Sequence, residues 1–448
     1  MIHAYELNGK HILLDVGSGA VHVTDPVAYY AVTHWPVSCE TLLAQFPGEN
    51  LEGLIEDIEA LIAAQKLFSP EIELPPAPGE ATLKALCLHV SHTCNLTCDY
   101  CFAQAGKYHG EEALMPFEVG RRALDYLLAH CGGHKNLEVD FFGGEPLLNW
   151  QVVKDLVRYA REKEREAGKR FRFTLTTNGV LIDDDVIGFC NREMSNVVLS
   201  LDGRPEVHDR LRRTANGRGS YDIVVPKFQK FVRARGEKNY YMRGTFTHFN
   251  PDFTRDLYHM AELGFHSLSM EPVVCAPDSD FALTAGDIER VKGEYEALAL
   301  EMARRRLRRS SAASLCSDPV FSFYHYNLDL KHGPCIYKRV KGCGSGTEYM
   351  AVTPSGAFYP CHQFVGEPEF CMGNVWDGVT RPDICAQFAA CTLQTKPECR
   401  DCWAKYWCAG GCAANAYHAS GSVQGVHKEG CELFRKRMEC AIWLAAGG

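Results

Sequence analysis

The chain has 448 residues, enough for about three domains of ordinary size. Hydrophobic residues make up 46% and charged residues 23%, as in a folded protein with a large buried core. The 47 basic and 56 acidic residues leave a net charge of −9, which argues against nucleic-acid binding as the main function. The sequence lacks a secretory signal pattern and the run of about 18 apolar residues that a membrane span needs. We therefore expect a cytoplasmic protein that binds neither nucleic acid nor membrane.

Residues 1–68 predict a small module of strands followed by helices. Alternating apolar runs at 5–7 and 11–16 flank Asn8-Gly9, a typical hairpin turn, and a third run follows at 20–23. Helical patterns cover 26–34 and 51–66. Residues 69–82 begin with a segment, 69–80, that contains four prolines, and they predict an extended linker.

From residue 83 to about 310, apolar strands alternate with longer helices. The predicted strands are 86–91, 137–142, 171–176, 197–201, 240–246 and 266–270. The predicted helices are 116–130, 151–168, 183–192, 221–235, 252–263 and 285–309. Six strand–helix units in sequence predict an α/β fold with a parallel sheet, either an open doubly wound sheet or an incomplete barrel. Residues 311–448 form a third region, in which cysteine density rises and helices shorten.

Cysteine is the unusual feature of the composition, with 21 residues. Because stable disulfides are rare in the cytoplasm, tightly spaced cysteines indicate metal binding. Cys94, Cys98 and Cys101 follow the first strand of the predicted sheet with C-x3-C-x2-C spacing. Three thiolates on a four-iron cluster leave one iron open, whereas a structural zinc site would need a distant fourth ligand.

Polar residues also follow two of the later strands. The second strand ends in Gly143-Gly144-Glu145-Pro146, where glycines allow close backbone approach to a ligand and a carboxylate suits an ammonium group. The fourth strand ends with Ser200 and Asp202 on one face, which suits ribose hydroxyls. The segment 177–179 by itself predicts only a turn.

Together these motifs resemble the signature of the radical SAM superfamily. The resemblance implies an incomplete (β/α)6 barrel in which the open iron chelates S-adenosylmethionine (SAM). It also implies that one electron from the cluster yields a 5′-deoxyadenosyl radical. By the same resemblance, Gly143, Gly144 and Glu145 hold the methionine amino group, and Ser200 and Asp202 hold the ribose.

Seven further cysteines form an array in the C-terminal region: Cys343, Cys361, Cys399, Cys402, Cys408, Cys412 and Cys431. The array resembles the SPASM domain, and a zinc ribbon fits its spacing less well. The resemblance implies two auxiliary clusters, hence three [4Fe–4S] clusters in all. Cys399, Cys402, Cys408 and Cys431 would hold the distal one, and Cys343, Cys361 and Cys412 the nearer one. Either Cys335 or a substrate thiolate would complete the nearer cluster.

The N-terminal module resembles the winged-helix-like recognition element of peptide-modifying enzymes, which takes up a leader peptide by strand addition; the alternative is a cap domain with no binding role. The whole chain resembles the thioether-forming maturases of six-cysteine precursor peptides, which belong to the sactipeptide synthases. That likeness implies a cysteine-rich precursor peptide bound partly through its leader, and an electron donor such as flavodoxin or ferredoxin.

Two other functions remain open from the sequence. One is that of an anaerobic sulfatase maturase, which oxidises cysteine or serine to formylglycine. That family usually has an aspartate directly after the cysteine of its Tyr-Pro-Cys segment, where this chain has His362. The other is that of a non-catalytic iron–sulfur protein, against which the strand-end motifs argue.

Overall fold

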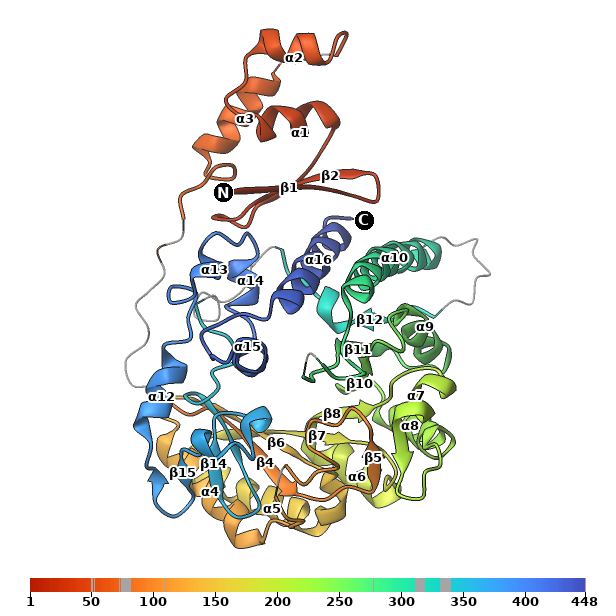
Figure 1. The fold of residues 1–448 in the computed structure, drawn as a ribbon, viewed down its shortest axis with the longest axis vertical. Helices are drawn as coiled ribbons and strands as arrows, with labels where there is room; N and C mark the ends of the chain where they lie inside the picture. The colour runs from red at the N-terminus through yellow and green to blue at the C-terminus, as the bar shows by residue number, and fades with distance from the viewer. Residues whose placement is uncertain are drawn as a thin grey trace.

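The computed structural model describes residues 1–49, 51, 53–71, 73, 82–108, 110–276, 278–310, 319–330 and 340–447. Figure 1 shows a small N-terminal module at one end and a large sheet covered by helices at the other. The C-terminal helix α16 (Lys428–Ala445) and the long helix α10 (Ala285–Ser310) lie between these two parts. In the described part of the chain, no helix is both long and apolar enough to cross a membrane.

The N-terminal module contains the predicted hairpin. Strands β1 (Ile2–Leu7) and β2 (Lys10–Asp15) pair antiparallel, and β3 (Val21–Thr24) adds to β2. Asn8 and Gly9 have φ values of 48° and 76°, as a two-residue hairpin turn with both central residues left-handed requires. Three helices follow: α1 (Pro26–Thr33), α2 (Cys39–Gln45) and α3 (Leu54–Ala63). Helix α2 was not predicted from the sequence.

One face of this small sheet packs onto the rest of the molecule. Tyr5 and Leu7 are buried in the same apolar core as the large sheet, whereas Leu13 belongs to a separate core beneath the module's helices. The Tyr5 hydroxyl donates to the Glu439 carbonyl of α16 at 2.9 Å. The His3 ring stacks on Trp403 with 3.8 Å between ring centroids. The module is therefore anchored to the C-terminal region through β1.

All six predicted strands of the central region are present and lie parallel in one sheet. They are β4 (Ala85–Ser91), β6 (Asn136–Gly143), β7 (Arg170–Thr177), β8 (Met194–Ser200), β10 (Tyr241–Phe246) and β11 (Ser267–Pro272). Their spatial order follows their sequence order, without the reversal that a doubly wound sheet requires. This order distinguishes between the two arrangements that the sequence left open and favours the barrel-like one.

The predicted helices are also present, within a few residues at each end. They are α4 (Phe117–His130), α5 (Trp150–Ala167), α6 (Asp184–Glu193), α8 (Tyr221–Arg235), α9 (Thr254–Glu262) and α10. The apolar faces of α4 and α5 contribute the fully buried Leu124 and Leu156 to the main core. Shorter elements lie between them: η1 (Pro146–Asn149), α7 (Pro205–Leu211), and the paired strands β5 (Leu96–Cys98) and β9 (Arg212–Thr214).

The C-terminal region continues the central sheet. Strand β13 (Tyr349–Val352) pairs parallel with β4, and β14 (Ala357–Tyr359), β15 (Gly373–Asn374) and β16 (Gly378–Val379) extend the sheet beyond it. The opposite edge is β12 (Ser322–Phe323), followed by η2 (Tyr324–Tyr326). The short helices are η3 (His362–Phe364), η4 (Pro368–Phe370), α12 (Pro382–Ala389), α13 (Pro397–Arg400), α14 (Lys405–Cys408) and α15 (Ala413–Ser420). The first barrel strand is thus covered by the C-terminal region.

Candidate functional site

The first cysteine loop leaves the end of β4 and crosses the adjoining strand ends. Cys94, Cys98 and Cys101 are all half-buried, and burial raises the pKa of Cys98 to about 12, with the charges of the other two thiols adding to the rise. Within the described residues, no group of His, Cys, Asp or Glu side chains could hold a metal ion as it stands. The fit of an iron–sulfur cluster therefore rests on the donor set, three thiols on one loop, because a bound metal would offset the cost of ionising them.

Gly143 and Gly144 hold this loop against the end of β6. A Cβ atom at Gly143 would lie 2.2 Å from the Ser91 carbonyl oxygen, and one at Gly144 would lie 2.2 Å from that of Thr93. The backbone N–H of Gly144 donates to Ser91 at 2.7 Å. The sequence predicted that these glycines admit a ligand. In the structure they admit the chain segment that leads into Cys94, and their contact to a ligand stays a prediction.

Glu145 is fully buried where the ends of β6 and β7 meet. Its carboxylate accepts hydrogen bonds from the Thr177 hydroxyl (2.8 Å) and from the backbone N–H groups of Asn178 (2.8 Å) and Leu147 (3.1 Å). Burial raises the pKa of Glu145 to about 7. Both carboxylate oxygens of Glu145 accept hydrogen bonds from the protein, so this side chain joins the ends of β6 and β7. A contact to a ligand ammonium group would add to these hydrogen bonds.

Asn178 belongs to a segment in which the sequence predicted only a turn. Its side-chain amide donates to the Asn95 side-chain oxygen at 2.8 Å and lies 3.6 Å from the Cys94 sulfur. Asn178 therefore links Glu145 to the cysteine loop. No local pattern identifies this role, because it arises from the pairing of strands far apart in the sequence.

Ser200 and Asp202, predicted to share a ribose site, differ in the structure. Ser200 is half-exposed at the end of β8. Asp202 is fully buried, and its carboxylate accepts from the Tyr100 hydroxyl (2.8 Å) and from Arg212 Nε (2.9 Å). Because Tyr100 lies in the cysteine loop and Arg212 pairs with Cys98 in the β5–β9 ladder, Asp202 positions that loop. The ribose contacts of both residues stay predictions.

We predict that Asp202→Asn costs about 3–5 kcal/mol of unfolding free energy, because it leaves the Arg212 guanidinium, only 12% exposed, without its counter-charge. Chemical denaturation monitored by circular dichroism would measure the loss. Asp155→Asn is the matched control, since its partner Arg158 is 67% exposed and the expected loss is within about 1 kcal/mol. Equal losses in the two variants would contradict the assigned role.

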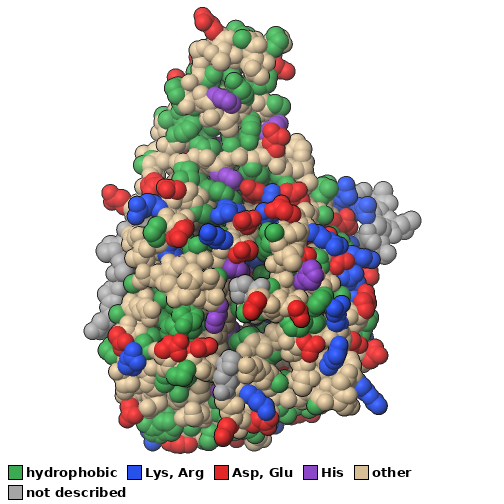
Figure 2. Space-filling model, in the orientation of Figure 1, with side chains coloured by type: hydrophobic (Ala, Val, Ile, Leu, Met, Phe, Trp, Pro, Cys, Tyr) green, Lys and Arg blue, Asp and Glu red, His purple; other side chains and the backbone are tan. Residues whose placement is uncertain are grey.

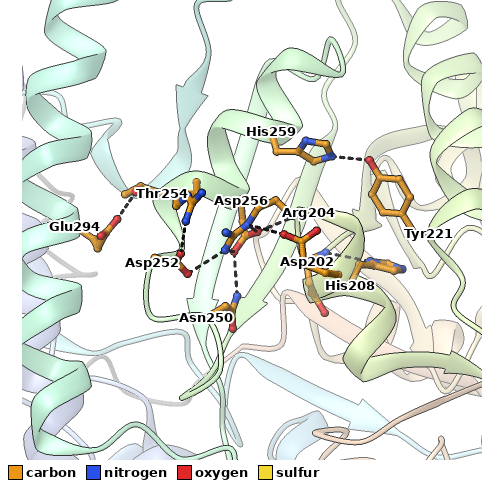
Figure 3. Close-up of polar contacts among 12 residues, drawn as sticks. Asp202, Arg204, His208, Tyr221, Asn250, Asp252, Thr254, Asp256, His259 and Glu294 are labelled. Atoms are coloured by element: carbon orange, nitrogen blue, oxygen red, sulfur yellow. Dashed lines mark hydrogen bonds and ion pairs between the residues drawn. The ribbon is translucent and has the colours of Figure 1, made fainter.

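The segment after Asp202 is fixed to helix α9. Gly203 has a φ of 114°, and a Cβ there would lie 2.2 Å from Asp256. Arg204 Nε donates to Asp256 at 2.7 Å, and a second guanidinium nitrogen donates to Asp252 at 3.0 Å. Figure 3 shows Arg204 between these two carboxylates, with His208 on the other side of Asp202. This network joins the segment after β8 to helix α9, and it thereby positions Asp202 for its hydrogen bonds with Tyr100 and Arg212.

Two of the C-terminal cysteines, Cys361 and Cys408, have pKa values that other cysteines raise. The charges of Cys343 and Cys412 raise the pKa of Cys361, after the larger effect of burial. The charges of Cys399, Cys402 and Cys431 likewise raise the pKa of Cys408 to about 12, again after burial. These influences fall within the two sets that the resemblance implied, and the assignment of each set to a cluster stays a prediction. Cys335, one of the two alternatives for completing the nearer set, lies outside the described residues.

His362 connects the nearer set to the first cysteine loop. The His362 ring lies 5.8 Å from the ring of Phe102, which directly follows Cys101, and 5.1 Å from that of Phe142 at the end of β6. Since His362 directly follows Cys361, one aromatic contact joins the two cysteine-bearing segments. Sequence analysis noted His362 only as a departure from the sulfatase maturases.

The inner face of the sheet is polar. Asp140 of β6 lies in register with Cys87 of β4 and Thr174 of β7. Burial raises the pKa of Asp140 from its ordinary value of 3.8 to about 6, and the neighbouring Glu138 adds to the rise. The folded chain therefore binds this proton more tightly than the unfolded chain does, and Asp140 makes folding less favourable as pH rises from about 4 to about 6.

We predict that Asp140→Asn stabilises the protein at pH 7.5 by up to about 3 kcal/mol, the free-energy equivalent of this pKa shift. The gain should vanish below about pH 4, where Asp140 is protonated in both states. Denaturation of both proteins across this pH range would measure the difference. A gain that did not change with pH would show that packing, and not the buried charge, is responsible.

Comparison with known proteins identifies part of the chain. Residues 88–261 match the model of the radical SAM superfamily. The radical SAM cyclopropyl synthase TigE of Paramaledivibacter caminithermalis is 22% identical over 375 residues, covering 79% of this chain and 72% of that protein. The serine-type anaerobic sulfatase-maturating enzyme of Bacteroides thetaiotaomicron is 22% identical over 373 residues, covering 76% and 85%.

Two solved structures share the fold. Native anSMEcpe with bound AdoMet aligns with a TM-score of 0.65 and 21% identity, covering 81% of this chain and 99% of that one. Streptococcus suis SuiB bound to S-adenosylmethionine aligns with a TM-score of 0.55 and 15% identity, covering 95% and 97%. SuiB has also been solved bound to its precursor peptide SuiA. These alignments confirm the predicted α/β fold with its large parallel sheet.

Proposed function

We propose that this chain, which carries a radical SAM domain over residues 88–261, forms intramolecular thioether bonds in a ribosomally made, cysteine-rich peptide. The observation that carries the proposal is the contact between Phe102 and His362, which directly follow Cys101 and Cys361. A thioether requires a carbon radical and a sulfur atom held side by side, and two adjacent cysteine sites could provide both.

In this proposal each cysteine set binds a different cluster. Cys94, Cys98 and Cys101 bind the SAM-cleaving cluster, and Cys399, Cys402, Cys408 and Cys431 bind the distal auxiliary cluster. Cys343, Cys361 and Cys412 leave one position of the nearer cluster for a substrate thiolate. When bound, the clusters supply the electron that cleaves SAM, an iron that holds sulfur and an acceptor for the surplus electron. The reaction also requires an electron donor, such as a reduced flavodoxin or ferredoxin. It would take place in the reducing cytoplasm, where the thiols stay free.

The chain's own residues position SAM and peptide. Ser200 hydrogen-bonds a ribose hydroxyl, while Asp202 keeps Tyr100 and Arg212 beside the cysteine loop. The segment Gly143–Glu145 offers its backbone to the methionine amino group. We assign residues 1–68 to leader binding, because β3 is an outer strand of its sheet and Val23 on it is 46% exposed. Figure 2 shows hydrophobic side chains gathered on this module, above a band of mixed charges.

A second candidate is a formylglycine-forming maturase, which the similarity to the Bacteroides thetaiotaomicron enzyme supports. The experiment that separates the candidates is mass spectrometry of a cysteine-rich peptide after anaerobic incubation with reconstituted enzyme, reductant and SAM. Thioether formation would remove two hydrogens and leave one cysteine that cannot be alkylated. Formylglycine formation from cysteine would remove the sulfur. An unmodified peptide with abundant 5′-deoxyadenosine would reject both for that peptide, and absence of SAM cleavage would revive the non-catalytic alternative.

A further inference from the structure

A charged cluster lies at the end of β11, five strands along the sheet from β4, which leads into the cysteine loop. Glu271 ends β11, and its carboxylate lies 2.9 Å from His325 Nε2 of η2 and 3.4 Å from a guanidinium nitrogen of Arg437 on α16. The side chains of His325 and Arg437 are only 7% and 15% exposed, whereas that of Glu271 is 33% exposed. One carboxylate thus faces a buried cation and a histidine.

Arg243 adds a second positive charge to this cluster. It lies on β10, in register with Ser200 of β8 and Ser269 of β11, so its side chain shares the inner face with theirs. The hydroxyl of Ser269, the β11 neighbour of Arg243, lies 3.4 Å from His325 Nε2, which joins Arg243 to this cluster. Arg243 is exposed and, within the described residues, makes no hydrogen bond or ion pair of its own. The cluster therefore has two guanidinium groups for one carboxylate.

We propose that Arg243 binds the carboxylate of an aspartate or glutamate side chain in the substrate peptide, close to the residue that is modified. This inference rests on the proposed function. A guanidinium with free N–H groups pairs with a carboxylate through two parallel hydrogen bonds. Glu271 pairs with His325 and Arg437 and does not bind the N–H groups of Arg243. Because Arg243 lies opposite Ser200, which the proposed function assigns to the ribose of SAM, its side chain projects from the inner face beside the place where the radical would form.

The carboxylate of SAM is the competing occupant for Arg243. The strand order favours the peptide. The Gly143–Glu145 segment, which the proposed function assigns to the methionine amino group of SAM, follows β6, three strands away from Arg243 on β10. The experiment below distinguishes the SAM carboxylate from a peptide carboxylate, because it measures SAM affinity separately from peptide selection.

The test is a binding selection with reconstituted full-length enzyme and SAM under anaerobic conditions. The probe is a library of peptides that are amidated at the C-terminus, with one fixed cysteine and random residues on both sides. Amidation removes the terminal carboxylate, so any acidic preference must come from side chains. For the wild type, we expect aspartate and glutamate to be enriched about tenfold or more at a fixed distance from the cysteine, as a charged bidentate contact implies.

Arg243→Gln should remove this enrichment, and Arg243→Glu should shift it towards lysine and arginine at the same position. SAM affinity should remain unchanged in both variants. Arg233→Gln, at an exposed position on α8, is the matched control and should select peptides as the wild type does. Thermal unfolding would verify that all variants are folded.

Three outcomes would overturn the inference. Retained peptides without acidic preference would exclude a carboxylate contact while leaving the proposed function intact. Weaker SAM binding by Arg243→Gln, with peptide selection unchanged, would assign Arg243 to the cofactor. Failure to retain any cysteine peptide above the background of beads without enzyme would count against peptide modification itself, and the inference would fall with it.

Discussion

Cys98→Ala is expected to abolish formation of 5′-deoxyadenosine from SAM. Cys98 is the middle cysteine of the first loop and is held in register with Arg212 by the β5–β9 ladder. Removing its thiol leaves two ligands, too few to hold a four-iron cluster with one open position. The preparation should also lose about four iron atoms per chain, which iron analysis and visible absorption would measure independently of activity.

The control for Cys98→Ala is Cys39→Ala. Cys39 is exposed on α2, far from the motif in the sequence, and its loss should change neither iron content nor SAM cleavage. Both variants should show circular dichroism spectra like that of the wild type. If Cys98→Ala kept its iron and still produced 5′-deoxyadenosine, the assignment of this loop to the SAM-cleaving cluster would be wrong.

The strands and helices of the central region could be predicted because each has a local cause. Alternation along β7 places Phe171 and Phe173 in the core, and turn residues separate the strands from the helices. The cysteine loop and the Gly143–Pro146 segment could be placed at strand ends for the same reason. The parallel orientation of the strands follows from the strand–helix connectivity, whereas their spatial order could not be predicted and was left open between two arrangements.

What could not be predicted depends on pairing between distant segments. The polar type of Glu145 and Asp202 suggested ligand contacts but gave no indication of their hydrogen bonds to Thr177 and Arg212. The pairing of β13 with β4 joins residues far apart in the sequence and leaves no periodic signal in either strand. The proline-rich segment suggested a separate N-terminal module, yet Tyr5 packs in the main core.

The second large effect is expected from Cys361→Ala. We expect this variant to keep cleaving SAM, because Cys94, Cys98 and Cys101 are untouched, but to form no crosslinked peptide. Cys361 is buried at the end of β14, and the charges of Cys343 and Cys412 add to the rise that burial causes in its pKa. Losing one of three ligands should remove about four iron atoms per chain and, with them, the place where the substrate sulfur would be held.

Cys385→Ala is the matched control for Cys361→Ala. Cys385 is half-buried on α12 with its sulfur 3.9 Å from that of Met372, outside both cysteine groups, so iron content and product should be unchanged. Iron analysis, 5′-deoxyadenosine release and peptide mass would be measured on the same preparations. Loss of SAM cleavage together with product would indicate that the two cysteine sites depend on each other for assembly. Full crosslinking by Cys361→Ala would instead exclude the nearer set from sulfur binding, and the thioether mechanism would then need another site to hold the substrate thiolate.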